Sequence, residues 1–180
     1  MRGLADLNVN IIATVGPNGD AAKIDVDPSR IRIVRFVPLD SLLTGVSVVV
    51  AHGGAGTVLA SLSRGLPLVL LPQGADQFIH ARQVASARAG IVLRPNEATP
   101  AAIRSALQQV LTNASIRGAA QDLAEEIAAM DSPDYVIEKL DRKLACLPEV
   151  DDDRFGGNRQ SLPSICRNSW RARFDQRRSV

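Results

Sequence analysis

Two short apolar runs, residues 46–51 and 68–71, constrain the fold of this chain more than any other feature. Each is apolar nearly throughout rather than alternating in polarity, which is typical of strands covered on both faces in a parallel sheet. Three further runs rich in β-branched residues, at 9–15, 31–37 and 91–93, are also expected to be strands. Parallel strands need crossover connections, so the segments between these runs should contain helices.

Helical patterns with clear ends follow the strands. Thr99-Pro100 and Ser132-Pro133 are each typical of an N-cap residue followed by proline in the first turn of a helix. The expected helices are residues 57–64, 77–89, 99–111, 115–130 and 134–144. This alternation implies right-handed βαβ units, and the predicted fold class is therefore α/β, a doubly wound, mostly parallel Rossmann-like sheet.

We expect one domain, residues 1–147, followed by a tail, residues 148–180, that is disordered or foreign to the domain. The tail has no apolar periodicity. The first 148 residues carry 14 basic and 14 acidic side chains, so this part of the chain lacks the excess of positive charge that is typical of nucleic-acid binding. Cys146 and Cys166 are both too close to the C-terminus to cross-link that body. With no signal peptide and no run near the roughly 18 apolar residues of a membrane span, we expect a soluble cytoplasmic protein.

The strand at residues 46–51 runs into the sequence AHGGAGT, residues 51–57, and a helix is expected directly afterwards. Glycines allow the backbone to approach an anion, and the N-terminus of a helix offers unpaired N–H groups and a positive dipole end. His52 would lie at the carboxyl edge of the sheet, where open α/β sheets bind ligands. Thr57 adds a hydroxyl. This pattern favours a diphosphate site, although a tight turn that needs glycine only for its geometry is the alternative.

Two other strand ends carry candidate ligand-binding residues. Asp76 and Gln77 follow the fourth strand, and a carboxylate beside an amide suits sugar hydroxyls; alternatively, Asp76 only caps the helix that it precedes. Phe36 ends the second strand and is a candidate for stacking on a base, with burial in the core as the alternative.

In combination, FVPL at 36–39, HGGAGT at 52–57 and PQGADQ at 72–77 resemble the donor-binding, C-terminal domain of antibiotic or macrolide glycosyltransferases of the GT-B type. These enzymes are related to the UDP-glycosyltransferases, and the similarity covers about residues 9–144. The resemblance implies a diphosphate held by His52, Gly53, Gly54, Gly56 and Thr57. It further implies a transferred sugar held by Asp76 and Gln77, and a base held by Phe36 and Val37.

The function implied by the resemblance is transfer of a hexosyl group from an NDP-sugar to a small lipophilic acceptor such as a polyketide, in antibiotic biosynthesis. It implies direct displacement with inversion, without a metal or cofactor. Related plant enzymes grip the ribose with Gln and Glu, where this chain has Leu39 and Ala60. A weaker ribose contact favours a dTDP-sugar donor, with a UDP-sugar as the second choice.

The resemblance also implies that parts of the enzyme lie outside this chain. The catalytic base of such enzymes comes from an amino-terminal domain, so we expect no catalytic residue here and do not nominate His80. The first central strand of the sheet, expected between the strands at 9–15 and 46–51, is apparently missing, and the isolated chain should be inactive. The alternatives are a non-catalytic nucleotide-binding accessory subunit, a remnant domain without a ligand, and a sugar-nucleotide epimerase, which the few ionisable groups at the sheet edge disfavour.

Overall fold

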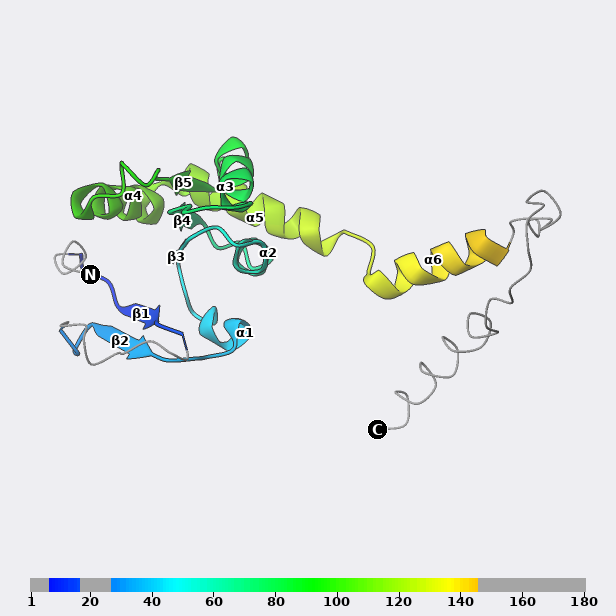
Figure 1. Cartoon of the computed structure of the whole chain (residues 1–180), viewed down its shortest axis with the longest axis horizontal. Helices are drawn as coiled ribbons and strands as arrows, with labels where there is room; N and C mark the ends of the chain where they lie inside the picture. The colour runs from blue at the N-terminus through cyan, green and yellow to red at the C-terminus, as the bar shows by residue number, and fades with distance from the viewer. Residues whose placement is uncertain (1–6, 17–26, 146–180) are drawn as a thin grey trace, which may run out of the picture. The chain divides into compact units, whose positions relative to one another are not determined.

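The computed structural model describes residues 7–16 and 27–145 of the 180-residue chain (Figure 1). The predicted tail at 148–180 and both cysteines lie outside the described residues. The chain divides into two compact units, Met1–Asp131 and Ser132–Val180. The described elements of the first unit are β1 (Ile11–Thr14), β2 (Ile31–Val34), α1 (Leu39–Leu42), β3 (Val49–Ala51), α2 (Ala55–Leu62), β4 (Leu68–Leu70), α3 (Gln77–Ser86), β5 (Gly90–Val92), α4 (Pro100–Thr112) and α5 (Ala114–Ala128). The second unit contains α6 (Pro133–Ala145).

The strands form two parallel sheets. One has the order β3-β4-β5 and the other pairs β1 with β2. The register of the larger sheet places Leu68 of β4 between Val49 of β3 and Gly90 of β5. The predicted α/β class with parallel strands is therefore confirmed. Within the described residues no hydrogen bonds join β1 to β3, so these two strands belong to different sheets. A further central strand was expected between β1 and β3, and that strand stays a prediction.

Strand β4 is the centre of the core because helices cover both of its faces. Leu68 and Leu70 pack with buried residues of α2, α3 and α5, while Val69 packs on the opposite side with buried residues of α4. All three strand residues have no exposed surface. Figure 1 shows the same arrangement, with α4 and α2 on different sides of β4. The prediction of a strand buried on both faces is confirmed for β4.

The same prediction is wrong for the preceding strand. The regular part of β3 begins at Val49, three residues later than expected, and none of its three residues is fully buried. The Val50 side chain is 43% exposed. The physical reason is that β3 hydrogen-bonds only to β4 among the described strands, so one of its edges has no neighbour there. An apolar run alone does not distinguish a central strand from an outer one.

The paired strands β1 and β2 are joined to the chain around them by polar contacts. The Arg30 guanidinium donates to the carbonyl of Leu7 at 3.2 Å, which fixes the start of β2 against the segment before β1. Just ahead of β2, Asp27 accepts hydrogen bonds from the hydroxyl and the amide of Ser29, and these hold the pKa of the Asp27 carboxyl below its ordinary value.

The predicted helix starts are confirmed where a side chain caps the helix. The hydroxyl of Thr99 accepts from the amide of Ala102 at the start of α4, and that of Ser132 accepts from Tyr135 at the start of α6. Helix α2 begins at Ala55, two residues earlier than expected. Helix α1 was not predicted at all. No helix in the described part of the chain is both long and apolar enough to span a bilayer.

Candidate functional site

The turn between β3 and α2 has a backbone that only glycine can adopt. Gly53 has a φ of +94°, a region that side-chain-bearing residues rarely occupy. A Cβ on Gly53 would also lie 3.2 Å from the backbone oxygen of Gln77, at the start of α3. Glycine at this position therefore brings the turn after β3 into contact with the turn after β4. Gly53, predicted for the diphosphate, and Gln77, predicted for the sugar, therefore lie next to each other.

His52 lies over the start of α2. A Cβ on Gly54, the N-cap residue of α2, would lie 2.8 Å from Nε2 of His52. Glycine at position 54 thus leaves room for the imidazole ring against the first backbone units of the helix. His52 is exposed, so its ring is open to a ligand on the other side. The anion-binding role of His52 stays a prediction.

The N-terminus of α2 has no cap. No side chain accepts a hydrogen bond from it, and within the described residues the amides of Ala55, Gly56 and Thr57 have no backbone acceptor. A Cβ on Gly56 would meet nothing within 4 Å, so this glycine adjoins open space. Unpaired N–H groups and the dipole of the helix together attract an anion.

Thr57 is the third residue of α2 rather than its first, which corrects the predicted start of the helix. The helix starts early because Gly54, with an extended backbone (ψ of 139°), serves as the N-cap and its carbonyl accepts from the amide of Val58 at 3.0 Å. The carbonyl of Thr57 accepts from the hydroxyl of Ser61 at 2.7 Å. Its own half-buried side chain stays in the first helical turn.

The turn between β4 and α3 is stabilised by its own side chain. Oε1 of Gln77 accepts from the amides of Gln73 at 2.8 Å and Gly74 at 3.3 Å. Ala75 has a φ of +52°, uncommon for a residue with a side chain. The oxygen of Gln77 is therefore used within the turn, and only its amide nitrogen is left to donate to a sugar hydroxyl. The sequence did not reveal this division of the Gln77 side chain.

Asp76 does not cap its helix. Its backbone is already helical, and no hydrogen bond joins its side chain to the first amides of α3. The carboxylate is 63% exposed, with Oδ2 4.0 Å from Nε2 of His80. The alternative that Asp76 serves only as an N-cap is therefore wrong. Its carboxylate is available to a ligand.

His80 connects the two turns, and sequence reasoning missed it as a site residue. Its Nδ1 lies 3.0 Å from the carbonyl oxygen of Gly53, across 27 positions of the sequence. The side chain is 28% exposed. The available signal was its spacing of four residues from Asp76, which places both side chains on one face of α3.

Phe36 is 75% exposed, so the alternative that it belongs to the core is wrong. Val37 is half-buried, and no backbone hydrogen bond within the described residues uses its N–H or C=O. Both residues stand between β2 and α1, free to meet a planar ligand. No hydrogen bond or ion pair in the described part of the chain joins Phe36 to His52 or Asp76.

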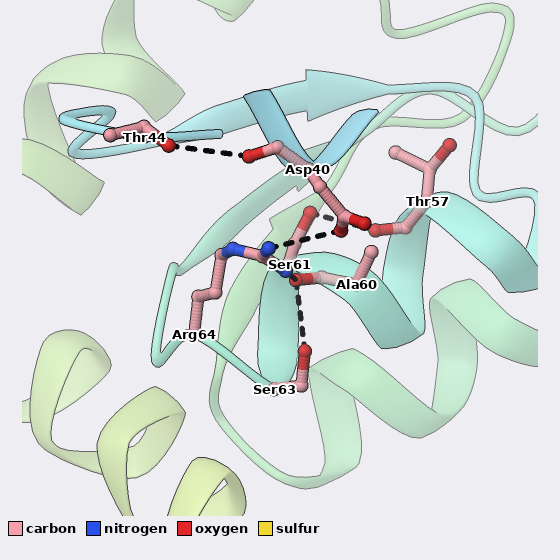
Figure 2. A network of polar contacts seen from close by, with 7 residues as sticks. All are labelled: Asp40, Thr44, Thr57, Ala60, Ser61, Ser63 and Arg64. Carbon is pink, nitrogen blue, oxygen red and sulfur yellow. Dashed lines mark hydrogen bonds and ion pairs between the residues drawn. The ribbon is translucent and has the colours of Figure 1, made fainter. Parts of the chain in front are cut away.

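An ion pair ties the segment that follows Phe36 to α2. In Figure 2 the Arg64 guanidinium lies between Asp40 of α1 and the end of α2. It contacts Oδ1 of Asp40 at 3.0 Å and the carbonyl of Ala60 at 3.3 Å, and the hydroxyl of Ser63 donates to the same carbonyl at 3.1 Å. The carbonyl of Asp40 accepts from the hydroxyl of Thr44. This network links the candidate base-binding segment to the helix of the diphosphate turn.

Within residues 7–16 and 27–145, no three His, Cys, Asp or Glu side chains gather in a way that could hold a metal ion. The turns after β3 and β4 bring together backbone amides, one exposed imidazole and one exposed carboxylate, while the exposed ring of Phe36 follows β2 of the other sheet. The amides and the imidazole suit an anion, the carboxylate suits sugar hydroxyls, and the ring suits a flat base.

Comparison with known families identifies the family of this chain. A family model described as the C-terminal domain of erythromycin biosynthesis protein CIII-like proteins matches residues 1–142. The chain is 35% identical over 145 residues to the 10-deoxymethynolide desosaminyltransferase of Streptomyces venezuelae, which covers 81% of this chain and 34% of that protein. The chain therefore spans about a third of the length of the relatives that it matches.

Solved structures give the same result. The glycosyltransferase VinC, crystallised in complex with DTDP, is 29% identical with a TM-score of 0.71, covering 78% of this chain and 35% of VinC. The spinosyn rhamnosyltransferase SpnG, complexed with thymidine diphosphate, is 32% identical with a TM-score of 0.71, covering 78% of this chain and 38% of SpnG. The fold of this chain is thus that of one part of these glycosyltransferases.

Proposed function

Because this chain belongs to the family of erythromycin biosynthesis protein CIII-like C-terminal domains, we propose that it binds the pyrophosphate of a nucleoside-diphosphate sugar, as the donor-binding part of a glycosyltransferase. One observation carries the proposal: Nε2 of His52 lies over Gly54, at the uncapped N-terminus of α2. The imidazole and the first helix amides converge on a space where a diphosphate can be hydrogen-bonded from two sides.

The rest of the donor would extend from the diphosphate in two directions. Asp76 and the amide nitrogen of Gln77 would bind hydroxyls of the transferred sugar, since both groups are at the adjacent turn. The base would stack on the exposed ring of Phe36 and bond to the backbone of Val37. Ion pairing between Asp40 and Arg64 supports this geometry, because it holds the base-binding segment to α2.

The reaction that we propose for the whole enzyme is a direct displacement. A hydroxyl of a small lipophilic acceptor, such as a polyketide, attacks the anomeric carbon, the bond to the diphosphate oxygen breaks, and the configuration inverts. His52 and the α2 amides stabilise the charge that develops on the leaving diphosphate, which is electrostatic catalysis. The base that takes the acceptor proton would come from outside this chain, which by itself should show no turnover. No metal is needed in this scheme.

The donor that we propose is a dTDP-linked deoxyhexose. Leu39 and Ala60 offer no polar side chain to ribose hydroxyls, so the loss of the 2′-hydroxyl in dTDP costs no contact. The carbonyl of Ala60 is already engaged by Arg64 and Ser63. The DTDP and thymidine diphosphate complexes of VinC and SpnG support this choice.

Thermal unfolding of the full chain with added nucleotides tests the proposal. A ligand that binds only the folded form raises the unfolding free energy by about 2.7 kcal/mol at a concentration 100 times its Kd. We expect dTDP to raise the Tm more than UDP, NAD to leave it unchanged, and EDTA to have no effect on the dTDP shift. A stronger shift with UDP would reverse the donor assignment, and no shift with either diphosphate would refute the function.

A further inference from the structure

His80 is the described side chain that contacts both turns of the site, and neither the diphosphate nor the sugar assignment uses it. Its Nδ1 lies 3.0 Å from the carbonyl oxygen of Gly53, and its Nε2 lies 4.0 Å from Oδ2 of Asp76. Resting on the proposed function, we propose that His80 is a positioning residue that sets the direction of the Gly54 amide toward the donor diphosphate.

The first step of the argument concerns the proton. A carbonyl oxygen can only accept a hydrogen bond, so Nδ1 of His80 must carry the proton that is donated to Gly53. Nε2, on the other side of the ring, lies 4.0 Å from Oδ2 of Asp76. The contact with Gly53 is thus a defined N–H···O bond from α3 to the diphosphate turn.

The second step concerns the peptide unit between Gly53 and Gly54. It is planar and trans, so its C=O and its N–H point in opposite directions. When His80 holds the carbonyl of Gly53, the N–H of Gly54 is turned away from α3. That N–H makes no backbone bond within the described residues, and Gly54 is the residue over which the His52 ring lies.

The third step concerns the backbone freedom that this bond removes. Both residues of the unit are glycines, whose backbones move more freely than those of other residues. Gly53 is held in its left-handed conformation, with a φ of +94°, next to the backbone of Gln77. Without the bond from His80, the peptide unit could rotate and direct its N–H elsewhere. A preorganised amide binds an anion better because no ordering is left to do on binding.

Two variants of the full chain test the role. His80→Asn places an amide N–H close to the position of Nδ1 and keeps the donor, whereas His80→Leu keeps the volume and loses the donor. The ligand-free readout is the NMR order parameter of the Gly54 amide. We expect about 0.85 in the unmodified chain and in His80→Asn, and below about 0.6 in His80→Leu. An unchanged value in His80→Leu, or an equal drop in both variants, would overturn the proposal.

The second readout separates positioning from general loss of structure. We expect His80→Leu to weaken dTDP about tenfold but dTMP, which lacks the second phosphate, much less, with Asn restoring dTDP affinity. If the unmodified chain binds no nucleotide while the order parameters change as expected, the proposed function fails and the positioning of the turn stands. If the unmodified chain binds dTDP and His80→Leu binds it equally well, the positioning role fails and the proposed function stands.

Discussion

The two turns at the carboxyl edge of the larger sheet differ in how their backbone amides are paired. Each leads from a parallel strand into a helix, β3 into α2 and β4 into α3. The turn before α3 satisfies its own amides, because Oε1 of Gln77 accepts from Gln73 and Gly74. The first amides of α2 have no acceptor in the described part of the chain, and an exposed imidazole lies beside them.

The turn before α3 pairs its amides with its own side chain, whereas the first amides of α2 are left to water or a ligand. Buried or partly buried polar groups are usually hydrogen-bonded, so unpaired amides at an open helix start are expected to bind water or an anion. The closed turn has a different use, since its fixed backbone displays Asp76 without using the carboxylate as a cap. The open turn would thus bind charge, and the closed turn would determine which sugar is attached to it.

The largest expected effect comes from adding a methyl group at Gly53, compared with the same change at Gly74 in the other turn. Gly53→Ala should destabilise the fold by about 1–3 kcal/mol, because alanine is strained at this φ and its Cβ would press on the backbone of Gln77. It should also abolish dTDP binding. Gly74→Ala is the matched control, because a Cβ there meets nothing within 4 Å. Urea unfolding measures the stability of both variants, and calorimetry measures their affinity for dTDP. Equal stability and equal affinity in the two variants would show that the two turns do not differ in this way.

The second effect is on binding without a change in stability. His52→Ala should weaken dTDP about tenfold to a hundredfold, since hydrogen bonds to charged groups contribute about 1.5–3 kcal/mol. His52 is exposed and its side chain makes no hydrogen bond or ion pair within the described residues, so the Tm without ligand should change little. Arg94→Ala, an exposed cation on the loop after β5, is the control and should retain affinity. Calorimetric titration of both variants decides whether the imidazole or general positive charge matters.

The sequence predicted the fold class, the order of the strands and the glycine-rich turn after β3 because these depend on local patterns. An apolar run, a Thr-Pro or Ser-Pro cap and a glycine cluster each act within a few residues. Thr99 and Ser132 cap their helices as expected. The recognised set of motifs also led to the correct family, which the match over residues 1–142 shows.

What the sequence did not predict depends on residues far apart in the chain. The bond from His80 to Gly53 spans 27 positions, and the pair of Arg64 with Asp40, which holds α1, spans 24. Helix α1 is only four residues long and has no side-chain cap, so no periodic signal marks it. The exposure of Val50 follows from the place of β3 in the sheet, which its own sequence does not encode.

The third prediction divides the two roles of Gln77. Gln77→Met removes the acceptor of two backbone amides and should destabilise the chain by about 1 kcal/mol. Gln77→Glu keeps an oxygen acceptor, so its stability should remain close to that of the unmodified chain. It loses the N–H donors, so the additional affinity of a dTDP-hexose over dTDP should fall. Chemical unfolding, together with titration of dTDP and of a dTDP-hexose, measures this. If Gln77→Glu and Gln77→Met are equally unstable, the oxygen does not close the turn.

The smallest expected effect on the fold, and the most selective effect on binding, comes from Asp76→Asn. The carboxylate is exposed and caps nothing, so stability should change by less than about 0.5 kcal/mol. The affinity for dTDP, which lacks the transferred hexose, should also remain unchanged. Only the additional affinity of a dTDP-hexose over dTDP should fall, because asparagine has one neutral oxygen acceptor in place of the two charged oxygens with which a carboxylate can accept from sugar hydroxyls. Asp122→Asn, on the exposed face of α5, is the control for the loss of a negative charge.

A drop in dTDP affinity with Asp76→Asn would mean that the closed turn also contacts the diphosphate, and the division of roles between the two turns would then be wrong.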